Sequence, residues 1–240
     1  MPTPEMSRPT SSTYETGISY AARCRDVVKV YRTKASVVFA LDGVDLDVPH
    51  GNVVAVFGPS GSGKSSLARI LAASDLPDDG TVEVNGLEIT ELGGRARRHL
   101  RRVAIGYVFA DPAHNLLPYL DAADHVELAL KMRGVWRRGH DVTEILESLG
   151  LGTRLNHVPA QLSGGEQQRL AVACAISGAP SLVVLDEPTA ELDRSSAEIL
   201  LDHLSALRSS GTTFVISSHD PAVAEMSDVV VELRKGSRVR

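Results

Sequence analysis

The chain contains 240 residues, of which 43% are hydrophobic, and it carries a net charge of -5. A chain of this length and composition can bury a sizeable core, which excludes global disorder. Its mildly acidic balance does not favour general nucleic-acid binding, so no nucleic-acid partner is expected. No run approaches the ~18 apolar residues of a membrane span, and the N-terminus lacks the apolar core of a secretory signal. We therefore expect a soluble, intracellular chain.

The first segment of the chain, residues 1 to about 20, is rich in Ser, Thr and Pro and has no hydrophobic periodicity. This composition is typical of a disordered tail, and it leaves one domain over residues 21–240. Two cysteines, Cys24 and Cys174, fall in segments that read as regular structure and lack the spacing of a metal site. Buried free thiols are therefore favoured over a disulfide or a metal centre.

Two kinds of strand pattern follow the tail. "VDLDV" at 44–48 and "TVEV" at 81–84 alternate apolar and polar residues, which predicts half-buried strands of an antiparallel sheet. Runs at 53–57, 182–185 and 213–217 are almost continuously apolar and rich in Val and Ile. Such runs are typical of parallel strands that are buried on both faces.

Each of the three apolar runs is followed directly by a polar cluster, which is "GPSGSGKSS", "DEP" or "SHD". In open α/β sheets ligands bind at the carboxyl ends of the strands, where these clusters lie. Between the first and second runs, apolar residues recur at helical spacing, as in Val142, Ile145, Leu146 and Leu149. The pattern predicts an α/β fold with a mostly parallel core sheet, an antiparallel β subdomain and a helical subdomain inserted at about 115–178.

The segment "GPSGSGKS", Gly58 to Ser65, matches the pattern GxxxxGK[ST] between a buried strand and a helical pattern. Its glycines let backbone amides surround phosphates, Lys64 can reach the terminal phosphates, and Ser65 can ligate Mg²⁺. The helix that follows favours an anion at its N-terminus. The alternative, a glycine-rich turn without a ligand, is disfavoured by the strand and helix on either side.

"LVVLDEP" places Asp186 and Glu187 directly after a buried strand. One carboxylate can then lie near Mg²⁺ and the other near a water that attacks a γ-phosphate. Two acids at a strand end are a weak signal alone, because turns favour Asp. The phosphate-binding loop makes the signal strong.

"LSGGEQQR" at 162–169 opens a helical pattern with Ser163, Gly164 and Gly165. A hydroxyl and backbone amides at a helix N-terminus form a second anion-binding device. The local alternative is a capping box between Ser163 and Glu166, which the local sequence alone favours.

The arginine-rich run "RARRHLRR" at 95–102 has two interpretations. It could bind nucleic acid or lipid headgroups, or it could be a solvated charged face. We favour the solvated face over the binding patch.

Together, the order and spacing of the phosphate-binding loop, "LSGGEQQR", "LVVLDEP", "AELD" and "SSHD" resemble those of ATP-binding-cassette (ABC) ATPases over nearly all of residues 24–238. The resemblance implies a P-loop NTPase fold that binds ATP and Mg²⁺ and hydrolyses ATP. It implies that Ser65 and Asp186 hold Mg²⁺. It also implies Glu187 as general base and His219 as a switch residue that contacts the γ-phosphate beside Lys64. The implied phosphate cradle consists of Gly58, Pro59, Ser60, Gly61, Ser62, Gly63, Lys64, Ser65 and Ser66.

The resemblance further implies how two chains cooperate. Tyr31 resembles the aromatic residue that stacks on adenine, although a tyrosine at a strand end can equally be part of the core. Asp193 resembles the acid of a loop that crosses a dimer interface. Two identical chains would sandwich two nucleotides, with ATP on one P-loop contacted by the partner's signature segment. The implied signature residues are Ser163, Gly164, Gly165 and Glu166.

Four further segments resemble the lipoprotein-release and macrolide-export group of ABC ATPases: "ALDGVDLDV", "LAASDLPDDGTVEVNG", "IGYVF" and "NLLPYLDAADHVELAL". Members of that group serve separate membrane permeases, which implies a peripheral position on the cytoplasmic face of the cell membrane. Two alternatives stay open. The chain could drive a membrane signalling or cell-wall-remodelling complex that transports nothing, or it could be a slow regulatory nucleotide-binding module.

The second alternative rests on Ala110, which follows "VF" where ABC ATPases typically have Gln. In that family the glutamine reaches Mg²⁺ and the attacking water and moves with the contact to the membrane subunit. An alanine side chain can neither donate nor accept a hydrogen bond. We therefore expect slow but real ATP hydrolysis. Neighbouring Asp111 could replace the glutamine as a water-mediated ligand, but it is displaced by one residue and could point elsewhere.

Overall fold

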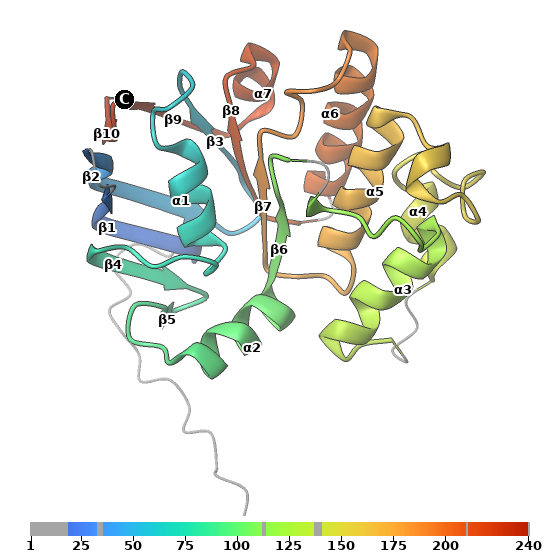
Figure 1. The fold of residues 1–240 in the computed structure, drawn as a ribbon, viewed down its shortest axis with the longest axis horizontal. Helices are drawn as coiled ribbons and strands as arrows, with labels where there is room; N and C mark the ends of the chain where they lie inside the picture. The colour runs from blue at the N-terminus through green and yellow to red at the C-terminus, as the bar shows by residue number, and fades with distance from the viewer. Residues whose placement is uncertain (1–18, 33–35, 112–113, 137–140, 210, 240) are drawn as a thin grey trace, which may run out of the picture.

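The computed structural model describes residues 19–32, 36–111, 114–136, 141–209 and 211–239. Residues 1–18 of the expected disordered tail lie outside the described residues, and the first strand already begins at Tyr20. The described residues form two sheets with helices around the larger one (Figure 1). This arrangement confirms the α/β fold class.

The smaller sheet is antiparallel and has the strand order β2-β1-β4-β5. In β2, Val44, Leu46 and Val48 are buried, whereas Asp45 is exposed between them. The predicted alternating strands at 44–48 and 81–84 are therefore confirmed. The bounds of the strands are β1 (Tyr20–Arg32), β2 (Val37–Pro49), β4 (Asp79–Val84) and β5 (Leu87–Glu88).

The larger sheet has the order β10-β9-β3-β8-β7-β6, with parallel pairing from β9 to β6. Its three central strands are buried almost throughout, as their continuous apolar sequences predict. The bounds are β3 (Val53–Phe57), β6 (Ile105–Val108), β7 (Leu182–Asp186), β8 (Phe214–Ser218), β9 (Val229–Arg234) and β10 (Ser237–Arg238).

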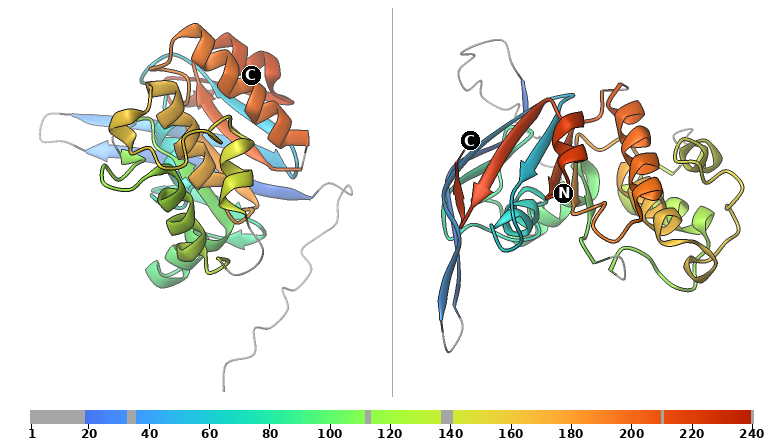
Figure 2. Two further views of the ribbon diagram at one scale, coloured as in Figure 1. Left: turned by 90° about the vertical axis from the view of Figure 1, so that its right-hand side faces the viewer. Right: turned by 90° about the horizontal axis from the view of Figure 1, so that it is seen from above.

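Helices cover the larger sheet and extend from one side of it. Figures 1 and 2 show α3, α4 and α5 gathered on the side away from β1 and β2, all from the chain between β6 and β7. The division of this region into a separate subdomain at about 115–178 stays a prediction. The bounds are α1 (Lys64–Leu71), α2 (Gly94–Ala104), α3 (Ala122–Arg133), α4 (Val142–Glu147), η2 (Pro159–Gln161), α5 (Gly164–Ile176), α6 (Arg194–Ser209) and α7 (Pro221–Met226).

Two local outcomes refine the sequence analysis. Helix α4 ends at Glu147, and the predicted helical position Leu149 lies in the turn that follows, because Gly150 adopts a positive φ of 68° there. Both cysteines are free, with Cys24 buried and Cys174 partly buried.

No helix in the described part of the chain combines the length and the apolar character of a membrane span.

The contact between α5 and β6 depends on Gly106. A Cβ atom at this position would lie 2.2 Å from the backbone oxygen of Ala175, much closer than van der Waals contact. Glycine therefore lets the helix approach the strand that leads to Ala110. The same close approach fixes how the helices that follow β6 sit against the parallel sheet.

We predict that Gly106→Ala lowers the free energy of unfolding by about 1–3 kcal/mol, because the helix must move away from the strand. Gly94→Ala is the matched control, since its Cβ would meet nothing closer than the Arg98 guanidinium at 3.6 Å. Urea unfolding of both variants measures the difference. Equal midpoints for the two variants would contradict the packing argument.

Candidate functional site

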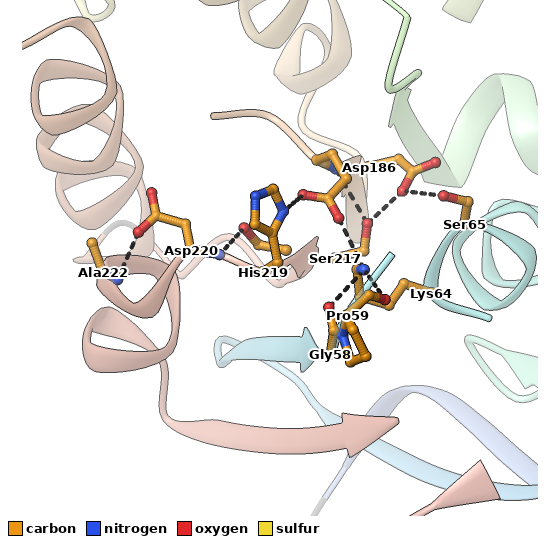
Figure 3. A network of polar contacts seen from close by, with 11 residues as sticks. Gly58, Pro59, Lys64, Ser65, Asp186, Ser217, His219, Asp220 and Ala222 are labelled. Atoms are coloured by element: carbon orange, nitrogen blue, oxygen red, sulfur yellow. Dashed lines mark hydrogen bonds and ion pairs between the residues drawn. The ribbon is translucent and has the colours of Figure 1, made fainter. Parts of the chain in front are cut away.

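Three parallel strands bring the predicted site residues to one edge of the sheet. β8 pairs with both β3 and β7, so the carboxyl ends of these three strands lie side by side. The loop Gly58–Gly63 follows β3, Asp186 ends β7, and Ser217 and Ser218 end β8. Figure 3 shows Asp186, Ser217 and Ser65 meeting at this edge, with Lys64 close by. The predicted convergence of the polar clusters is thus present.

The glycine-rich loop turns back over the start of α1. Gly63, which caps the helix, has a φ of 105°, and a Cβ there would lie 2.2 Å from the oxygen of Ala40. Lys64 begins the helix and is 4% exposed. Its Nζ donates to the oxygens of Gly58 at 2.8 Å and Pro59 at 3.0 Å. The loop therefore holds an ammonium group at its centre, which provides charge for an anion.

Asp186 is buried, with 2% exposure, and joins three elements. Its Oδ1 accepts hydrogen bonds from Ser65 Oγ of α1, at 3.0 Å, and from Ser217 Oγ of β8 (Figure 3). Burial raises the pKa of Asp186 above its ordinary value, although the two hydroxyl groups oppose the shift. The ionised carboxylate is therefore costly here, and a cation would stabilise it.

Glu187 has a strained backbone that directs its carboxylate into the same space. Its φ of 48° lies in the left-handed region, which is uncommon for a residue other than glycine. Its backbone N–H donates to the oxygen of Ser217 at 2.9 Å. Its carboxylate contacts Lys64 Nζ at 3.0 Å and His219 Nδ1 at 3.0 Å. Lys64, Glu187 and His219 thus form one connected set.

Ser217 is a site residue that the sequence analysis missed. It contacts both acids, through the Oδ1 of Asp186 and the backbone N–H of Glu187. Asp220, two residues after the end of β8, caps α7 by accepting from the Ala222 N–H at 3.0 Å and so orients the segment that carries His219. The position of Ser217 at the end of an apolar run was the signal that could have identified it.

A cavity of about 310 Å³ extends from the phosphate-binding loop to the end of β1. Its volume lies in the range of small-molecule sites. Tyr31 lines it, and so do Lys64, Ser65 and Glu187. The remaining lining residues are Val38, Ala40, Ser60, Gly61, Gly63 and Ser66. Tyr31 is 37% exposed, so it belongs to the cavity wall rather than to the buried core.

The second glycine-rich segment forms the capping box that its local sequence favoured. Ser163 caps α5, with its Oγ accepting from the Glu166 N–H, while Glu166 accepts from the Ser163 N–H at 2.8 Å. Arg154, which sequence reasoning did not identify, donates to Glu166 at 2.7 Å. These hydrogen bonds, first that from the Ser163 backbone, lower the pKa of Glu166 to about 2.

The two predicted interface segments lie apart from the phosphate-binding loop. Among the described residues that line the 310 Å³ cavity, none belongs to Ser163–Glu166 or is Asp193. Asp193 precedes α6 and accepts from the backbone N–H of Ser196 at 3.0 Å and from its hydroxyl at 2.7 Å. Gly164 and Gly165 belong to the first turn of α5. Within one chain, these residues do not meet the cavity.

Ala110 lies beside the acids in a separate space of about 130 Å³. Glu187 and Glu191 line this space, together with Gly164, Gln167, Gln168, Pro188 and Leu192. Asp111 does not line it, and its carboxylate contacts His114 Nδ1 at 3.2 Å instead. The replacement of the glutamine by Asp111 stays a prediction.

The raised pKa of Asp186 predicts a pH-dependent stability. A carboxyl group whose pKa is raised by folding destabilises the protein progressively as pH rises above its ordinary value of 3.8, and the loss is complete above the raised pKa. Asp186→Asn removes the charge and keeps a hydrogen-bond acceptor. With chelator present, the melting temperature of this variant should exceed that of the wild type at pH 8, and the difference should shrink as the pH is lowered toward 3.8. Equal melting temperatures at all pH values would contradict this assignment.

Comparison with known proteins identifies the family of the chain. The family model described as "ABC transporter" matches residues 41–190. The lipoprotein-releasing system ATP-binding protein LolD 2 of Caulobacter vibrioides is 43% identical over 215 residues, covering 88% of this chain and 93% of that protein. The macrolide export ATP-binding/permease protein MacB of Hyphomonas neptunium is 39% identical over 214 residues, which are 88% of this chain but 33% of that protein.

Solved structures agree with these relatives. The dimeric ATP-binding cassette MJ0796, described in a post-hydrolysis state with ADP and phosphate, has a TM-score of 0.82 and 33% sequence identity. The match covers 91% of this chain and 97% of that one. ABC cassettes hydrolyse ATP, and the P-loop, the paired acids and the histidine of this chain meet at one sheet edge. The chain belongs to the ABC transporter family of ATP-binding proteins and is an ATPase subunit of that family.

Proposed function

We propose that this ABC ATPase drives a separate membrane permease from a peripheral position on the cytoplasmic face of the cell membrane. The observation that carries the proposal is the connected set of Lys64, Glu187 and His219 beside the cavity that Tyr31 lines. Because this chemistry needs a nucleotide with a γ-phosphate, the cavity is a site for ATP. Hydrolysis then supplies the free energy for a change in the permease.

Mg²⁺ fits the oxygen atoms beside the phosphate-binding loop. Ser65 Oγ and Asp186 Oδ1 lie 3.0 Å apart, and both are hard oxygen ligands. Within the described residues no cluster of three or more His, Cys, Asp or Glu could hold a metal alone. Mg²⁺ commonly binds through one or two protein ligands plus phosphates and water, which matches this arrangement. When bound, the ion neutralises charge on the phosphates.

Hydrolysis requires Lys64 and Glu187 to exchange partners. The Lys64 ammonium contacts Glu187 and two loop carbonyls, all oxygen atoms that phosphate oxygens can replace. Lys64 bound to phosphate leaves the Glu187 carboxylate available to accept a proton from the attacking water. His219, 3.0 Å from Glu187, orients that carboxylate and reaches toward the γ-phosphate.

Two copies of the chain would complete the nucleotide site. Ser163–Glu166 begin α5 with Arg154 and Glu166 fixing the turn, and they do not line the cavity of their own chain. The amide groups at such a helix N-terminus favour an anion, so ATP held by a second copy is a suitable partner. MJ0796, which resembles this chain, is described as dimeric. Asp193 then lies in the loop that crosses between the two copies.

The permease contact requires a surface outside the nucleotide cavity. A cavity of about 730 Å³ lies between α2 and α3 and also reaches α5. Arg95, Arg98, His99, Arg101, Arg102 and Arg133 line it, with Ala129, Met132 and Cys174, and this lining contains no acidic side chain. Charge complementarity therefore favours an acidic cytoplasmic segment of the permease. We call this arginine-lined cavity the groove. In this proposal the arginine-rich run binds a protein partner and not nucleic acid or lipid.

The relatives point to the cargo class. LolD 2 of Caulobacter vibrioides is named for lipoprotein release and MacB of Hyphomonas neptunium for macrolide export. We assign the permease of this chain to that group, with an amphiphilic or lipid-linked cargo moved away from the cytoplasm. Among the described residues, no contact in the site favours the alternative of a membrane signalling or cell-wall-remodelling complex.

Two variants test the roles of Glu187 and Ala110. Glu187→Gln should lower kcat for ATP by about 10² or more, because the general base is lost. Ala110→Gln should raise kcat by up to about 10², because it restores a polar group beside the acids. Ala110→Met, which has a similar length but no hydrogen-bonding amide, is the control and should not accelerate the reaction. Phosphate release by the chain with its permease measures all three.

The result that would contradict catalysis is specific. If wild-type protein with its permease hydrolysed ATP no faster than Glu187→Gln, the chain would be a regulatory nucleotide-binding module. If Ala110→Met accelerated hydrolysis as much as Ala110→Gln, filling the space rather than restoring a polar contact would explain the effect.

A charge reversal tests the arginine-lined groove. Arg98→Glu should weaken binding to the purified permease at least about fivefold at low salt and should make binding less sensitive to added salt. Lys235→Glu, which changes the net charge equally in the hairpin between β9 and β10, is the control. Basal ATP hydrolysis should stay unchanged in both. Normal permease affinity for Arg98→Glu at low salt would exclude this groove.

A further inference from the structure

Tyr31 and Val38 form one end of the nucleotide cavity. The two residues are directly paired across β1 and β2, and both line the cavity together with the phosphate-binding loop. The paired ends of these strands project away from the rest of the molecule (Figure 2). An aromatic ring on a projecting hairpin needs other contacts to hold one orientation.

Lys29 and Asp75 supply those contacts. Lys29 lies two residues before Tyr31 on β1, so both side chains are on the same face of the strand. Its Nζ, in a side chain that is largely buried, donates to Asp75 Oδ1 at 2.9 Å and to the Leu76 oxygen at 2.6 Å. The hydroxyl of Tyr31 donates to the other oxygen of Asp75, at 3.3 Å. One carboxylate therefore joins the lysine to the tyrosine.

The lysine also contacts the tyrosine ring directly. Lys29 Nζ lies over the Tyr31 ring, 5.5 Å from its centroid, within the range of a cation–π contact. The ammonium group occupies one face of the ring, and the opposite face is free of that cation. Asp75 also accepts from the Leu76 N–H at 2.8 Å, which fixes the carboxylate in the loop after α1.

Asp75 keeps its charge in this cluster. Burial alone would raise its pKa, but the hydrogen bond from Lys29, the Leu76 N–H, the Lys29 charge and the Tyr31 hydroxyl together lower the pKa below its ordinary value. The carboxylate is therefore ionised at neutral pH and accepts from both side chains at once. A neutral side chain at position 75 would hold the lysine and the tyrosine less firmly.

We propose that Lys29 and Asp75 are positioning residues that hold the Tyr31 ring in the orientation that stacks on the base of the bound nucleotide. The proposal rests on the proposed function, in which the cavity that Tyr31 lines is the site for ATP. A ring that is already fixed loses less conformational entropy when the nucleotide binds. The pair therefore acts on nucleotide affinity and not on the hydrolytic step. Its effect is limited to ligands that carry a base.

Calorimetric titration of the full chain with Mg²⁺-ADP and Mg²⁺-pyrophosphate tests the proposal, because only ADP carries a base. Tyr31→Phe keeps the ring and removes the hydroxyl, and Asp75→Asn removes the charge. Each should weaken ADP binding about 3- to 10-fold, the effect of one modest hydrogen bond, and should leave pyrophosphate affinity within about twofold. The double variant should bind ADP no more weakly than the weaker single variant, because both changes break the same contact.

Each other outcome has a defined meaning. Unchanged ADP affinity in Tyr31→Phe would overturn the proposal, as would an equal loss of ADP and pyrophosphate affinity in Asp75→Asn. If Asp75→Asn did not fold, Tyr31→Phe alone would decide, since it removes one oxygen at a partly exposed site. Lys64→Met should abolish binding of both ligands. A wild-type chain that bound neither ligand would instead refute the proposed function.

Discussion

The buried carboxylate of Asp186 is the contact on which the arrangement of the site depends. It ends β7 and accepts hydrogen bonds from Ser65 on α1 and Ser217 on β8, so it joins the phosphate-binding helix to two strands of the parallel sheet. Parallel pairing from β3 to β7 makes this possible, because it places three carboxyl strand ends side by side. Burial of this carboxylate raises its pKa, because the ionised form loses solvation. A cation bound beside it would offset that loss.

Glu187 extends this constraint from the proposed metal ligand to the proposed general base. Its left-handed backbone and its N–H bond to Ser217 turn the carboxylate toward Lys64 and His219. The strain is maintained because β7 fixes the backbone before Glu187 and the Glu187 N–H donates to Ser217 of β8. Ala110, in the loop after β6, lines a small space together with Glu187 and Glu191 and brings no polar side chain to it. The side of the site next to the helices therefore lacks a polar contact at position 110.

Much of this was predictable from local patterns. Continuous apolar runs identified β3, β7 and β8, and the alternating run at 44–48 identified the antiparallel sheet, because burial on two faces or on one leaves different periodicities. The motifs that follow the runs then converge on one sheet edge as a consequence of parallel pairing. The capping box at Ser163 follows from two residues three positions apart.

Contacts between distant segments were not predictable from one sequence. Ser217 between the two acids, Arg154 on Glu166, and Asp75 on Tyr31 join residues 30, 12 and 44 positions apart. Nothing in the local sequence of Lys29 or Asp75 distinguishes them from surface charges. The arginine-rich run is exposed at Arg95, Arg98 and Arg102, as a solvated face would be, but its neighbour Arg133 of α3 could not be identified from the sequence.

The most direct test of the account is the Mg²⁺-dependent rate of ATP hydrolysis by the full chain with its permease, compared between wild type and Asp186→Asn. If Asp186 holds the ion, wild-type ATP hydrolysis requires Mg²⁺. The Asp186→Asn variant, although folded and no less stable, then no longer hydrolyses ATP at a Mg²⁺-dependent rate. A folded Asp186→Asn protein that hydrolysed Mg²⁺-ATP at the wild-type rate would contradict the central claim.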